Sequence, residues 1–515
     1  MKSLRLFLTS LFACFLTTSL SFGQQTEVDS SKLLIDKIKE EASKNSELEV
    51  MAHYLFDING PRLTASPGIR KAGEWMQKKL NSWNMDNVRM EEWGTFGKGW
   101  KQINFSGRVL TPFIKPLQGL AMPWSGSTNG KITAPVSLAP IKNKDASGYP
   151  EITTSDHLKA VKGNLEGSIV MLRPPSEITI EDNANYRFRL SEEDFFGSRE
   201  HAVDAEKPAA NLNLINELIE GLYEKHAIQE EILATAGVKA VLLPSTRDHG
   251  VIRHHGNWAG IRAEEGTNIL PRIVLSKEQY NWVYRTVSNG QEVKIELDIE
   301  NKFYPEDTGF NILGEIKGSM LPEEYVVLGA HMDSWTWGVG AIDNGSGVLI
   351  IMEAMRILKA LDIKPKRTIL AAFWGGEEQG ILGSQKWVAS HIDLNNKISA
   401  YFNLDNGTGK IVGVRDQYFH SSKPVLDSIL APIKDLGVLG ARHSATGSSD
   451  HLPFYANNIP AFTFIQDPLE YELRVQHSQL DTYDHLSFDD LKQASIVAAY
   501  IIYTVANRND LMPRD

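Results

Sequence analysis

Apolar and polar positions alternate in blocks along residues 323–384. Two short apolar runs, residues 325–328 and 368–373, have the length and the β-branched residues of buried strands, and acidic residues and glycine follow each of them. Between them, residues 347–361 form an apolar run of helical length that is preceded by N-capping residue types. The order strand, loop, helix, strand, loop predicts a doubly wound α/β sheet, which binds ligands beyond the carboxyl ends of its strands.

The same alternation continues to the end of the chain. Residues 399–404 predict a strand that ends in Asp405, and residues 459–465 predict another strand. Residues 488–507 predict an amphipathic helix that covers the sheet. We therefore assign residues 306–515 to a catalytic domain with a doubly wound mixed sheet.

The first half of the chain has a different pattern of residue types. We expect residues 24–106 to form a helical part that packs on the catalytic domain, with one helix over residues 69–83. Residues 107–305 contain several prolines, short β-rich runs and one polar helical stretch, residues 212–234, and they predict an inserted β-rich domain. The runs that predict its strands are residues 131–138, 168–172, 238–243, 273–275 and 293–297.

Residues 1–23 have the pattern of a secretory signal peptide. Lys2 and Arg5 precede an apolar run, and small residues follow it. Cleavage there would make the mature chain secreted or periplasmic, whereas a retained membrane anchor is the alternative. The only cysteine, Cys14, lies inside this segment, so the mature chain would have no disulfide and no thiol nucleophile. No later segment of the sequence is long and apolar enough to span a bilayer.

The composition indicates the class of protein and the kinds of molecule that it binds. The chain has 515 residues, of which 42% are hydrophobic and 23% charged, as in an ordinary globular protein of two or three domains. The 53 basic and 64 acidic residues give a net charge of −11, which argues against a nucleic-acid partner.

Charged side chains gather directly after the predicted strands and before the predicted helix. These side chains are His331, Asp333, Asp343, Glu377 and Glu378. Charged groups near a buried sheet edge are costly unless they are paired or bind a metal ion. Imidazole together with carboxylates suits zinc and its chemical neighbours. The pattern therefore predicts a metal site at this edge.

A second group of histidines lies in the predicted insert. We interpret His249, His254 and His255 as parts of a solvated basic loop, since such clusters usually face water. No metal-type cluster of acids and histidines is predicted in the insert.

The motifs around these acids resemble a known family. His331-Met-Asp-Ser-Trp335, Glu377-Glu-Gln-Gly380 and the closing Gln476-His477-Ser-Gln-Leu-Asp481-Thr are similar to motifs of the dizinc exopeptidases, which include bacterial aminopeptidases and plasma glutamate carboxypeptidase (carboxypeptidase Q). The resemblance covers most of the chain after residue 30 and is strongest from residue 323 onward. It implies a catalytic domain of the zinc-exopeptidase type, with a protease-associated domain inserted before it. Residues 167–172 and 236–242 look like pieces of that insert.

The resemblance also implies a ligand set for two zinc ions, with cobalt or manganese as substitutes. The five residues that match the family's ligands are His331, Asp343, Glu378, Asp405 and His477. Asp343 would bridge the two metals. His331 and Asp405 would complete one site, and Glu378 and His477 would complete the other.

Two further residues carry expected roles. Glu377 would be the general base, which activates the bridging water and passes its proton to the leaving amine. Asp333 would hydrogen-bond the imidazole of His331 and so fix its tautomer and orientation.

Three functions are compatible with this pattern. The first is a secreted or periplasmic dizinc exopeptidase acting on peptides or dipeptides, with the attacked chain end and the oligomeric state, a homodimer included, left open. The second is a zinc-dependent glutaminyl cyclase, which has a related fold. The third is a noncatalytic peptidase-like ectodomain, which the retention of all five ligand-type residues and Glu377 argues against.

Overall fold

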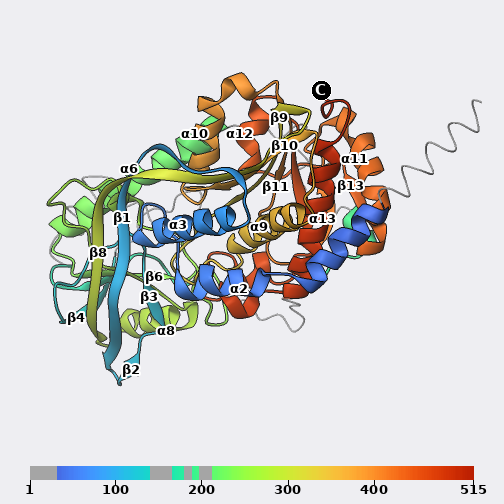
Figure 1. Cartoon of the computed structure of the whole chain (residues 1–515). Coiled ribbons are helices and arrows are strands. Elements are labelled where there is room, and N and C mark those ends of the chain that lie inside the picture. Colours follow the sequence, from blue (N-terminus) through green and yellow to red (C-terminus); the bar gives the residue numbers. More distant parts are fainter. Residues whose placement is uncertain (1–31, 140–164, 179–187, 197–211) are drawn as a thin grey trace, which may run out of the picture.

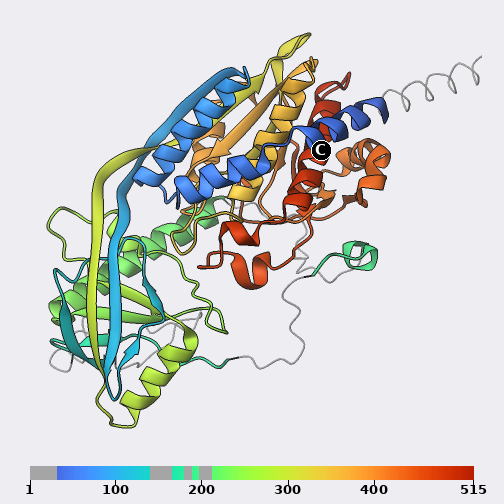
Figure 2. The same cartoon turned by 60° about the horizontal axis from the view of Figure 1, so that its bottom comes forward.

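The computed structural model describes residues 32–139, 165–178, 188–196 and 212–515. The expected signal peptide lies outside these residues and stays a prediction. Within the described residues, no helix combines the length and the apolar character that a bilayer crossing requires. Figures 1 and 2 show a larger lobe, built from the C-terminal half and the N-terminal helices, and a smaller lobe built from the middle of the chain.

The larger lobe is built on a mixed sheet. Its strands are β9 (Leu321–His331), β10 (Arg367–Trp374), β11 (Ile398–Asn403), β12 (Ile411–Arg415), β13 (Gly440–Arg442) and β14 (Ala461–Gln466). They lie in the order β13-β12-β14-β11-β9-β10, and β8 (Lys294–Ile316) follows β10. Strands β10, β9, β11 and β14 are parallel, whereas β12 and β8 run antiparallel to their neighbours β14 and β10.

Helices cover both faces of this sheet. Helices α9 (Gly345–Ala360) and α13 (Phe488–Ala506) share one hydrophobic core with Val326 and Leu328 of β9. Helices α10 (Leu382–Ser390) and α12 (His451–Ala456) lie on the other face, where Val327 shares a core with Trp387 and Phe454. The prediction of an α/β fold with a doubly wound mixed sheet is therefore confirmed.

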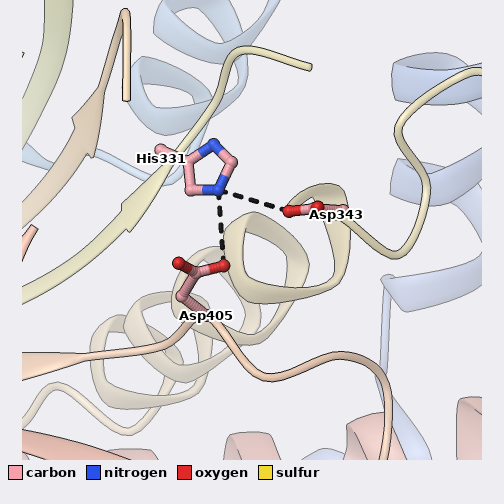
Figure 3. Close-up of side chains that lie close together, drawn as sticks. All are labelled: His331, Asp343 and Asp405. Atoms are coloured by element: carbon pink, nitrogen blue, oxygen red, sulfur yellow. Dashed lines mark ion pairs between the residues drawn. The ribbon is translucent and has the colours of Figure 1, made fainter. Parts of the chain in front are cut away.

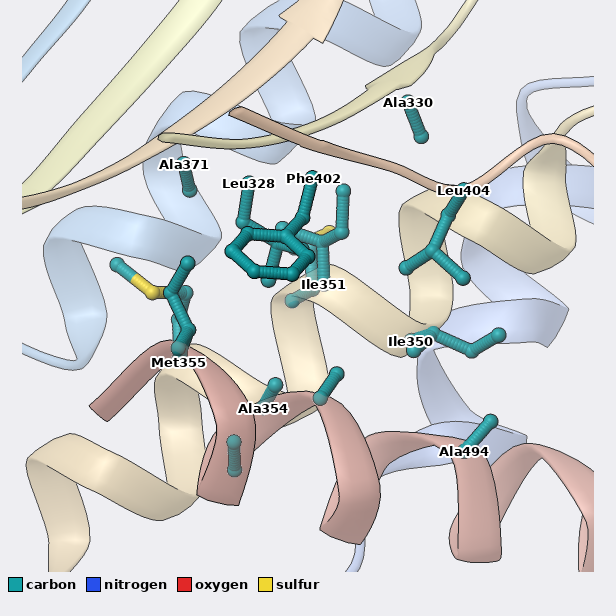
Figure 4. Close-up of a cluster of buried hydrophobic side chains, with 14 of the residues drawn as sticks. Leu328, Ala330, Ile350, Ile351, Ala354, Met355, Ala371, Phe402, Leu404 and Ala494 are labelled. Carbon is teal, nitrogen blue, oxygen red and sulfur yellow. The ribbon is translucent and has the colours of Figure 1, made fainter. Parts of the chain in front are cut away.

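Helix α9 lies at the centre of the larger lobe. Its first turn is capped by Asn344, whose side-chain oxygen accepts a hydrogen bond from the N–H of Gly347 at 3.2 Å. Further along, Ile351 packs between the strands and α13, which contributes Ala494 (Figure 4). A helix that is apolar on nearly every side is held from all directions. Burial of α9 therefore fixes Asp343, the residue before the cap, at the carboxyl edge of the sheet.

Two long strands connect the lobes. Strand β1 (Asp86–Thr111) pairs antiparallel with β8 along its length, and Figure 1 shows the two strands running side by side between the lobes. The expected domain limits at residues 106/107 and 305/306 both fall inside these continuous strands. The prediction that residues 24–106 form a helical part is wrong from Asp86 onward.

The reason lies in the pairing of β1 with a partner about 200 residues away in sequence. Six register shifts interrupt the ladder, and each one disturbs the alternation of inward and outward side chains. Much of β1 is also exposed, so little of it shows a buried apolar face. The two-residue period that identifies a strand in a sequence is therefore absent here.

The smaller lobe contains short strands at four of the five predicted positions, namely β4 (Ile132–Leu138), β5 (Ile169–Met171), β6 (Ala240–Pro244) and β7 (Arg272–Leu275). The fifth predicted run, residues 293–297, overlaps the start of the long strand β8. Two further strands were not predicted, β2 (Lys115–Pro116) and β3 (Gly119–Ala121). Strands β4, β5, β6 and β7 are parallel and in this order, and β3 closes the edge antiparallel to β7. The same lobe contains the helices α6 (Leu212–Thr235) and α8 (Lys277–Ser288). The assignment of this lobe as a protease-associated domain stays a prediction.

The N-terminal segment is helical as far as residue 82. A helix over residues 32–44 is followed by α2 (Leu48–Ala52), the π-helix η1 (His53–Ile58) and α3 (Pro67–Ser82). The side chain of Ser66 caps α3, which matches the predicted helix closely. The remaining short elements are α5 (Glu192–Phe196), α7 (Trp258–Ile261), η2 (Ile392–Leu394), η3 (His420–Ser422), α11 (Lys423–Leu430), η4 (Ala431–Leu436), η5 (Tyr471–Val475) and η6 (Tyr483–His485).

Candidate metal centre

The carboxyl ends of the parallel strands meet at one edge of the larger sheet. His331 ends β9, Glu377 and Glu378 follow β10, and Asp405 follows β11. Parallel neighbours bring these ends together, so residues far apart in the sequence become neighbours in space. His477 joins them from the loop after η5.

The first cluster joins one histidine to two aspartates. The Nε2 atom of His331 lies 3.4 Å from Oδ1 of Asp343 and 3.3 Å from Oδ1 of Asp405. Figure 3 shows the two carboxylates converging on this single ring nitrogen. His331 is almost fully buried, so the three side chains meet in a site with little access to bulk water.

The second cluster contains the other histidine. The Nε2 atom of His477 lies 3.1 Å from Oδ2 of Asp343 and 3.0 Å from Oε2 of Glu378. Asp343 thus turns one oxygen towards each cluster. All five residues that the sequence suggested as ligands are brought together in these two groups.

The donor set fits metal ions. Two ligands of a tetrahedral zinc ion, each about 2.0–2.2 Å from it, lie roughly 3.3–3.6 Å apart, close to the 3.0–3.4 Å separations found here. Among the described residues, Oδ2 of Asp343, Oε1 of Glu378 and Nδ1 of His477 are buried without a hydrogen-bond partner. Buried polar atoms normally have partners, and bound cations would account for the two carboxylate oxygens.

Burial and crowding shift the pKa values of the cluster. Burial raises the pKa of Glu377 well above its usual value, and the charges of Asp405 and Asp450 act in the same direction. Burial lowers the pKa of His477, but the charges of Glu378 and Asp343 outweigh it and raise this pKa to about 10. The shifts report a strongly negative local field, which a divalent cation would neutralise.

Asp333 lies where the sequence placed it, and it has two sets of partners. The Nδ1 atom of His331 is 3.1 Å from the backbone carbonyl oxygen of Asp333 and 3.6 Å from its carboxylate. The carboxylate accepts hydrogen bonds from the backbone N–H groups of Glu377 and Glu378, each at 3.2 Å. The main chain of Asp333 therefore contacts the imidazole, while its side chain holds the loop after β10.

Comparisons with known proteins identify the family. Residues 311–502 match the family model described as Peptidase family M28. This part of the chain belongs to that family. Carboxypeptidase Q of Mus musculus is 26% identical over 462 residues, which are 89% of this chain and 86% of that protein. Carboxypeptidase Q of Homo sapiens is 25% identical over 94% of this chain and 90% of its own length.

Two solved structures resemble most of this chain. The peptidase M28 precursor of Shewanella amazonensis has a TM-score of 0.67 at 24% identity, over 95% of this chain and 99% of that one. BSAP, a zinc aminopeptidase of Bacillus subtilis, has a TM-score of 0.57 at 20% identity, over 91% and 97% of the two chains. The structural likeness shows the fold, and the family match makes the chain a metallopeptidase.

The smaller lobe reaches the two clusters of candidate metal ligands. The ring of His255 lies 5.5 Å from that of His477 and 5.8 Å from that of Trp335, between ring centres. Next to it, Arg253 donates to the backbone carbonyl of Gln476 at 3.0 Å. Trp335 in turn donates its Nε1–H to Oε2 of Glu378 at 2.7 Å. Trp335 therefore forms part of the wall of the site.

The interpretation of the histidine loop as solvated is wrong for His254. Its side chain is buried, and its backbone carbonyl accepts a hydrogen bond from the Nε1–H of Trp337 at 2.7 Å. Packing between the lobes produces this burial, and the sequence gives no local signal of it.

The loop after His477 supports the opposite side of the site. The carboxylate of Asp481 accepts hydrogen bonds from the backbone N–H groups of Ile342 and Asp343, at 2.5 and 3.2 Å.

Ser449 is a contact of the site that the sequence did not predict. Its hydroxyl donates a hydrogen bond to Oδ2 of Asp405 at 2.7 Å. Ser449 stands among other small polar residues, so nothing in the sequence distinguishes it.

Proposed function

We propose that this M28 peptidase is a dinuclear zinc exopeptidase that hydrolyses peptide bonds at chain ends or in dipeptides. The observation that carries the proposal is the position of Asp343, whose two oxygens face different histidines at 3.4 and 3.1 Å. Asp343 would bridge the metals, with His331 and Asp405 on one ion and Glu378 and His477 on the other. Cobalt or manganese would substitute for zinc.

The metals would lower the pKa of a water molecule and polarise the carbonyl group that it attacks. The protein's own residues supply the proton transfer. Oε2 of Glu377 lies 4.0 Å from Nε2 of His331, at the rim of the first cluster. In the proposed role, this oxygen takes a proton from the attacking water and later gives it to the nitrogen of the departing amine.

Two neighbours would hold the reacting groups in place. The carboxylate of Asp333 fixes the backbone of Glu377, so the general base has a defined position. Trp335 orients Glu378 through its indole N–H.

Peptide hydrolysis with controlled metal content tests this function. A panel of dipeptides, N-blocked peptides and C-amidated peptides is incubated with the enzyme before and after treatment with a chelator. We expect hydrolysis from a chain end, its loss after chelation, and its return with zinc or cobalt. Activity that survives complete removal of metal would refute the proposal. The panel also identifies which chain end is attacked.

We further propose that residues 1–23 are a cleaved signal peptide and that the mature enzyme is secreted or periplasmic. The basic start and apolar run of this segment support the proposal. N-terminal sequencing of the protein recovered from outside the cytoplasm tests it. A mature protein that retains Lys2 and Arg5 would contradict cleavage.

A further inference from the structure

Two segments from the middle of the chain hold the loop that carries His477. This loop, residues 467–482, follows β14, and we call it the His477 loop. Near its start, Leu469 forms an antiparallel β-bridge with Phe188. Phe188 donates its backbone N–H to the carbonyl oxygen of Leu469 at 3.3 Å, and Leu469 donates in return at 2.9 Å. The start of the loop is therefore tied to a segment that lies between β5 and α5 in the sequence.

Arg189, the next residue of that segment, pairs with two buried carboxylates. Its Nη1 donates to Oδ2 of Asp467 at 2.7 Å, and its Nη2 donates to Oδ2 of Asp490 at 2.8 Å. The side chain of Asp467 is only 5% exposed and that of Asp490 only 2%. The backbone N–H of Leu190 donates to the other carboxylate oxygen of Asp467 at 3.0 Å. Because a buried carboxylate that loses its cation is strongly destabilising, both aspartates depend on this arginine.

The two aspartates belong to different parts of the larger lobe. Asp467 is the first residue of the His477 loop, and Asp490 lies in the first turn of α13. Helix α13 shares a hydrophobic core with α9, which begins two residues after Asp343. Arg189 thus joins the start of the His477 loop to the helices that hold Asp343 in place.

A buried aromatic ring anchors the same segment to the larger lobe. Phe195 of α5 is fully buried and shares a hydrophobic cluster with Val412 of β12 and Ile465 of β14. Gly413 leaves room for the ring, because a Cβ atom at this position would lie 2.5 Å from it. In Figure 2, α5 (green) lies beside the larger lobe and apart from the sheet of the smaller lobe. We call residues 188–196 the clasp.

The second segment holds the loop on the other side of His477. Ser478 forms an antiparallel β-bridge with Arg253, and Nη2 of Arg253 donates to the side-chain oxygen of Gln476 at 3.2 Å. Between these contacts, His477 has a φ of 55°, which residues other than glycine adopt rarely. Such a conformation persists only where the surrounding structure imposes it. The backbone of His477 therefore depends on the contacts of its loop.

The histidine of the other proposed metal site is held differently. His331 is the last residue of β9, which lies between β11 and β10 in the middle of the larger sheet. Its position follows from strand pairing on both sides. A disturbance of the His477 loop should thus displace His477 more than His331.

We propose that the clasp positions His477 and thereby sets the affinity of the metal site that Glu378 and His477 would form. Arg189 is the positioning residue, and it acts on His477 through Asp467 at the start of the loop. The inference rests on the proposed dinuclear centre and adds an asymmetry to it. Release of the clasp weakens the ion at His477 and spares the ion that His331 would hold.

The test measures zinc affinity in proteins that retain one site each. Asp405→Ala should keep only the ion of Glu378 and His477, and Glu378→Ala only the ion of His331 and Asp405. Arg189→Gln is introduced into each background, and competition with a chelator of known affinity gives the dissociation constant of the remaining zinc ion. We expect this constant to rise about tenfold in Asp405→Ala, the lower end of the range for groups that orient metal ligands, and to stay unchanged in Glu378→Ala.

Three further substitutions in both backgrounds separate the clasp from general effects. Phe195→Ala removes the apolar anchor and should act as Arg189→Gln does. Arg189→Lys keeps a positive charge but not the planar fork that reaches two carboxylates, so it should lose less affinity than Arg189→Gln. The matched control is Arg108→Gln, since Arg108 is 50% exposed against 48% for Arg189 and pairs with Glu296 in the smaller lobe. It should bind zinc as its parent does.

Equal loss of zinc affinity in both backgrounds, or no loss in either, would overturn the role of the clasp and leave the dinuclear centre standing. Thermal melts show whether each variant is folded, and where Arg189→Gln is not, Phe195→Ala provides the same comparison. A wild type that binds a single zinc ion would instead refute the dinuclear centre. In that case hydrogen exchange of the metal-free wild type and Arg189→Gln decides whether the clasp positions His477. Faster exchange confined to the His477 loop would support this role, and unchanged exchange would refute it.

Discussion

The carboxylate of Asp481 accepts a hydrogen bond from the backbone N–H of Asp343 at 3.2 Å. Asp481 stands four residues after His477 in the sequence, so the loop that carries one proposed ligand also holds the backbone of another. The two clusters of candidate metal ligands are thus connected through Asp343. A change in the closing loop should therefore affect both clusters.

The first prediction concerns this support. Asp481→Ala should weaken zinc binding by about 10–100-fold, the range found when groups that orient metal ligands are removed. Competition with a chelator of known affinity measures the change. Asp484→Ala, which removes an exposed carboxylate from the same loop, is the matched control and should bind zinc as the wild type does. Wild-type affinity in Asp481→Ala would show that Asp343 needs no such support.

The second prediction distinguishes the shared carboxylate from an unshared one. Asp343→Ala should lose both metal ions, because each proposed site would lose a ligand. Asp405→Ala should keep the ion held by Glu378 and His477 and lose the other. Elemental analysis of the purified variants gives the metal content per chain.

Asp393→Ala, at an exposed position of η2, is the control for the loss of a carboxylate alone. Thermal melts under identical conditions show whether each variant is folded. Equal metal content in Asp343→Ala and Asp405→Ala would mean that Asp343 does not bridge two ions.

The third prediction separates metal binding from proton transfer at adjacent residues. Glu377→Gln should keep its metal content and lose turnover by about 10²–10⁴-fold, the usual contribution of a general base. The substitution preserves size and removes the group that takes the proton. Steady-state kinetics together with elemental analysis make the test. Glu472→Gln, an exposed glutamate, should leave both quantities unchanged. An active Glu377→Gln enzyme would rule out this residue as the base.

Much of the larger lobe could be predicted because its signals are local. Strands β9 and β10 are short buried runs, and α9 carries its own capping residue, so a window of 10 to 20 residues contains the necessary information. Four of the five candidate ligands follow directly from such elements, since His331, Glu378 and Asp405 stand at or after strand ends and Asp343 stands just before a helix. The family resemblance added His477 to the candidate ligands, because His477 lies in a loop after η5 and follows no strand.

The contributions of the smaller lobe could not be predicted in the same way. The contact of His255 with His477 joins residues more than 200 positions apart, and the hydrogen bond from Trp337 to His254 joins residues 83 positions apart. Both contacts depend on packing between the lobes. The carboxylate of Asp333 was assigned to the nearest imidazole, although it accepts hydrogen bonds from a loop 44 residues further on. Tertiary packing decides such partners, and a single sequence does not record it.

The last prediction concerns stability in acid and rests on His451, the first residue of α12. Its side chain is fully buried, and its Nε2–H donates to the carbonyl of Thr446 at 2.9 Å. Burial lowers the pKa of His451 to about 4, against a usual value near 6.5 in an unfolded chain. As the pH falls below about 6.5, His451 therefore binds a proton in the unfolded state, whereas in the folded state it binds one only when the pH reaches about 4.

The free energy of unfolding should consequently decrease between pH 6.5 and pH 4 and level off below this window as far as His451 is concerned. A difference of roughly 2.5 pKa units corresponds to about 3 kcal/mol. Urea unfolding at pH 7, 5.5 and 4 measures it. His451→Gln keeps a donor for Thr446 and cannot titrate, so its stability should decline less than that of the wild type by this amount. His53→Gln, at an exposed position of η1, is the control for the replacement of an imidazole. Parallel decline of the wild type and His451→Gln would show that the buried ring accepts its proton without cost to the fold.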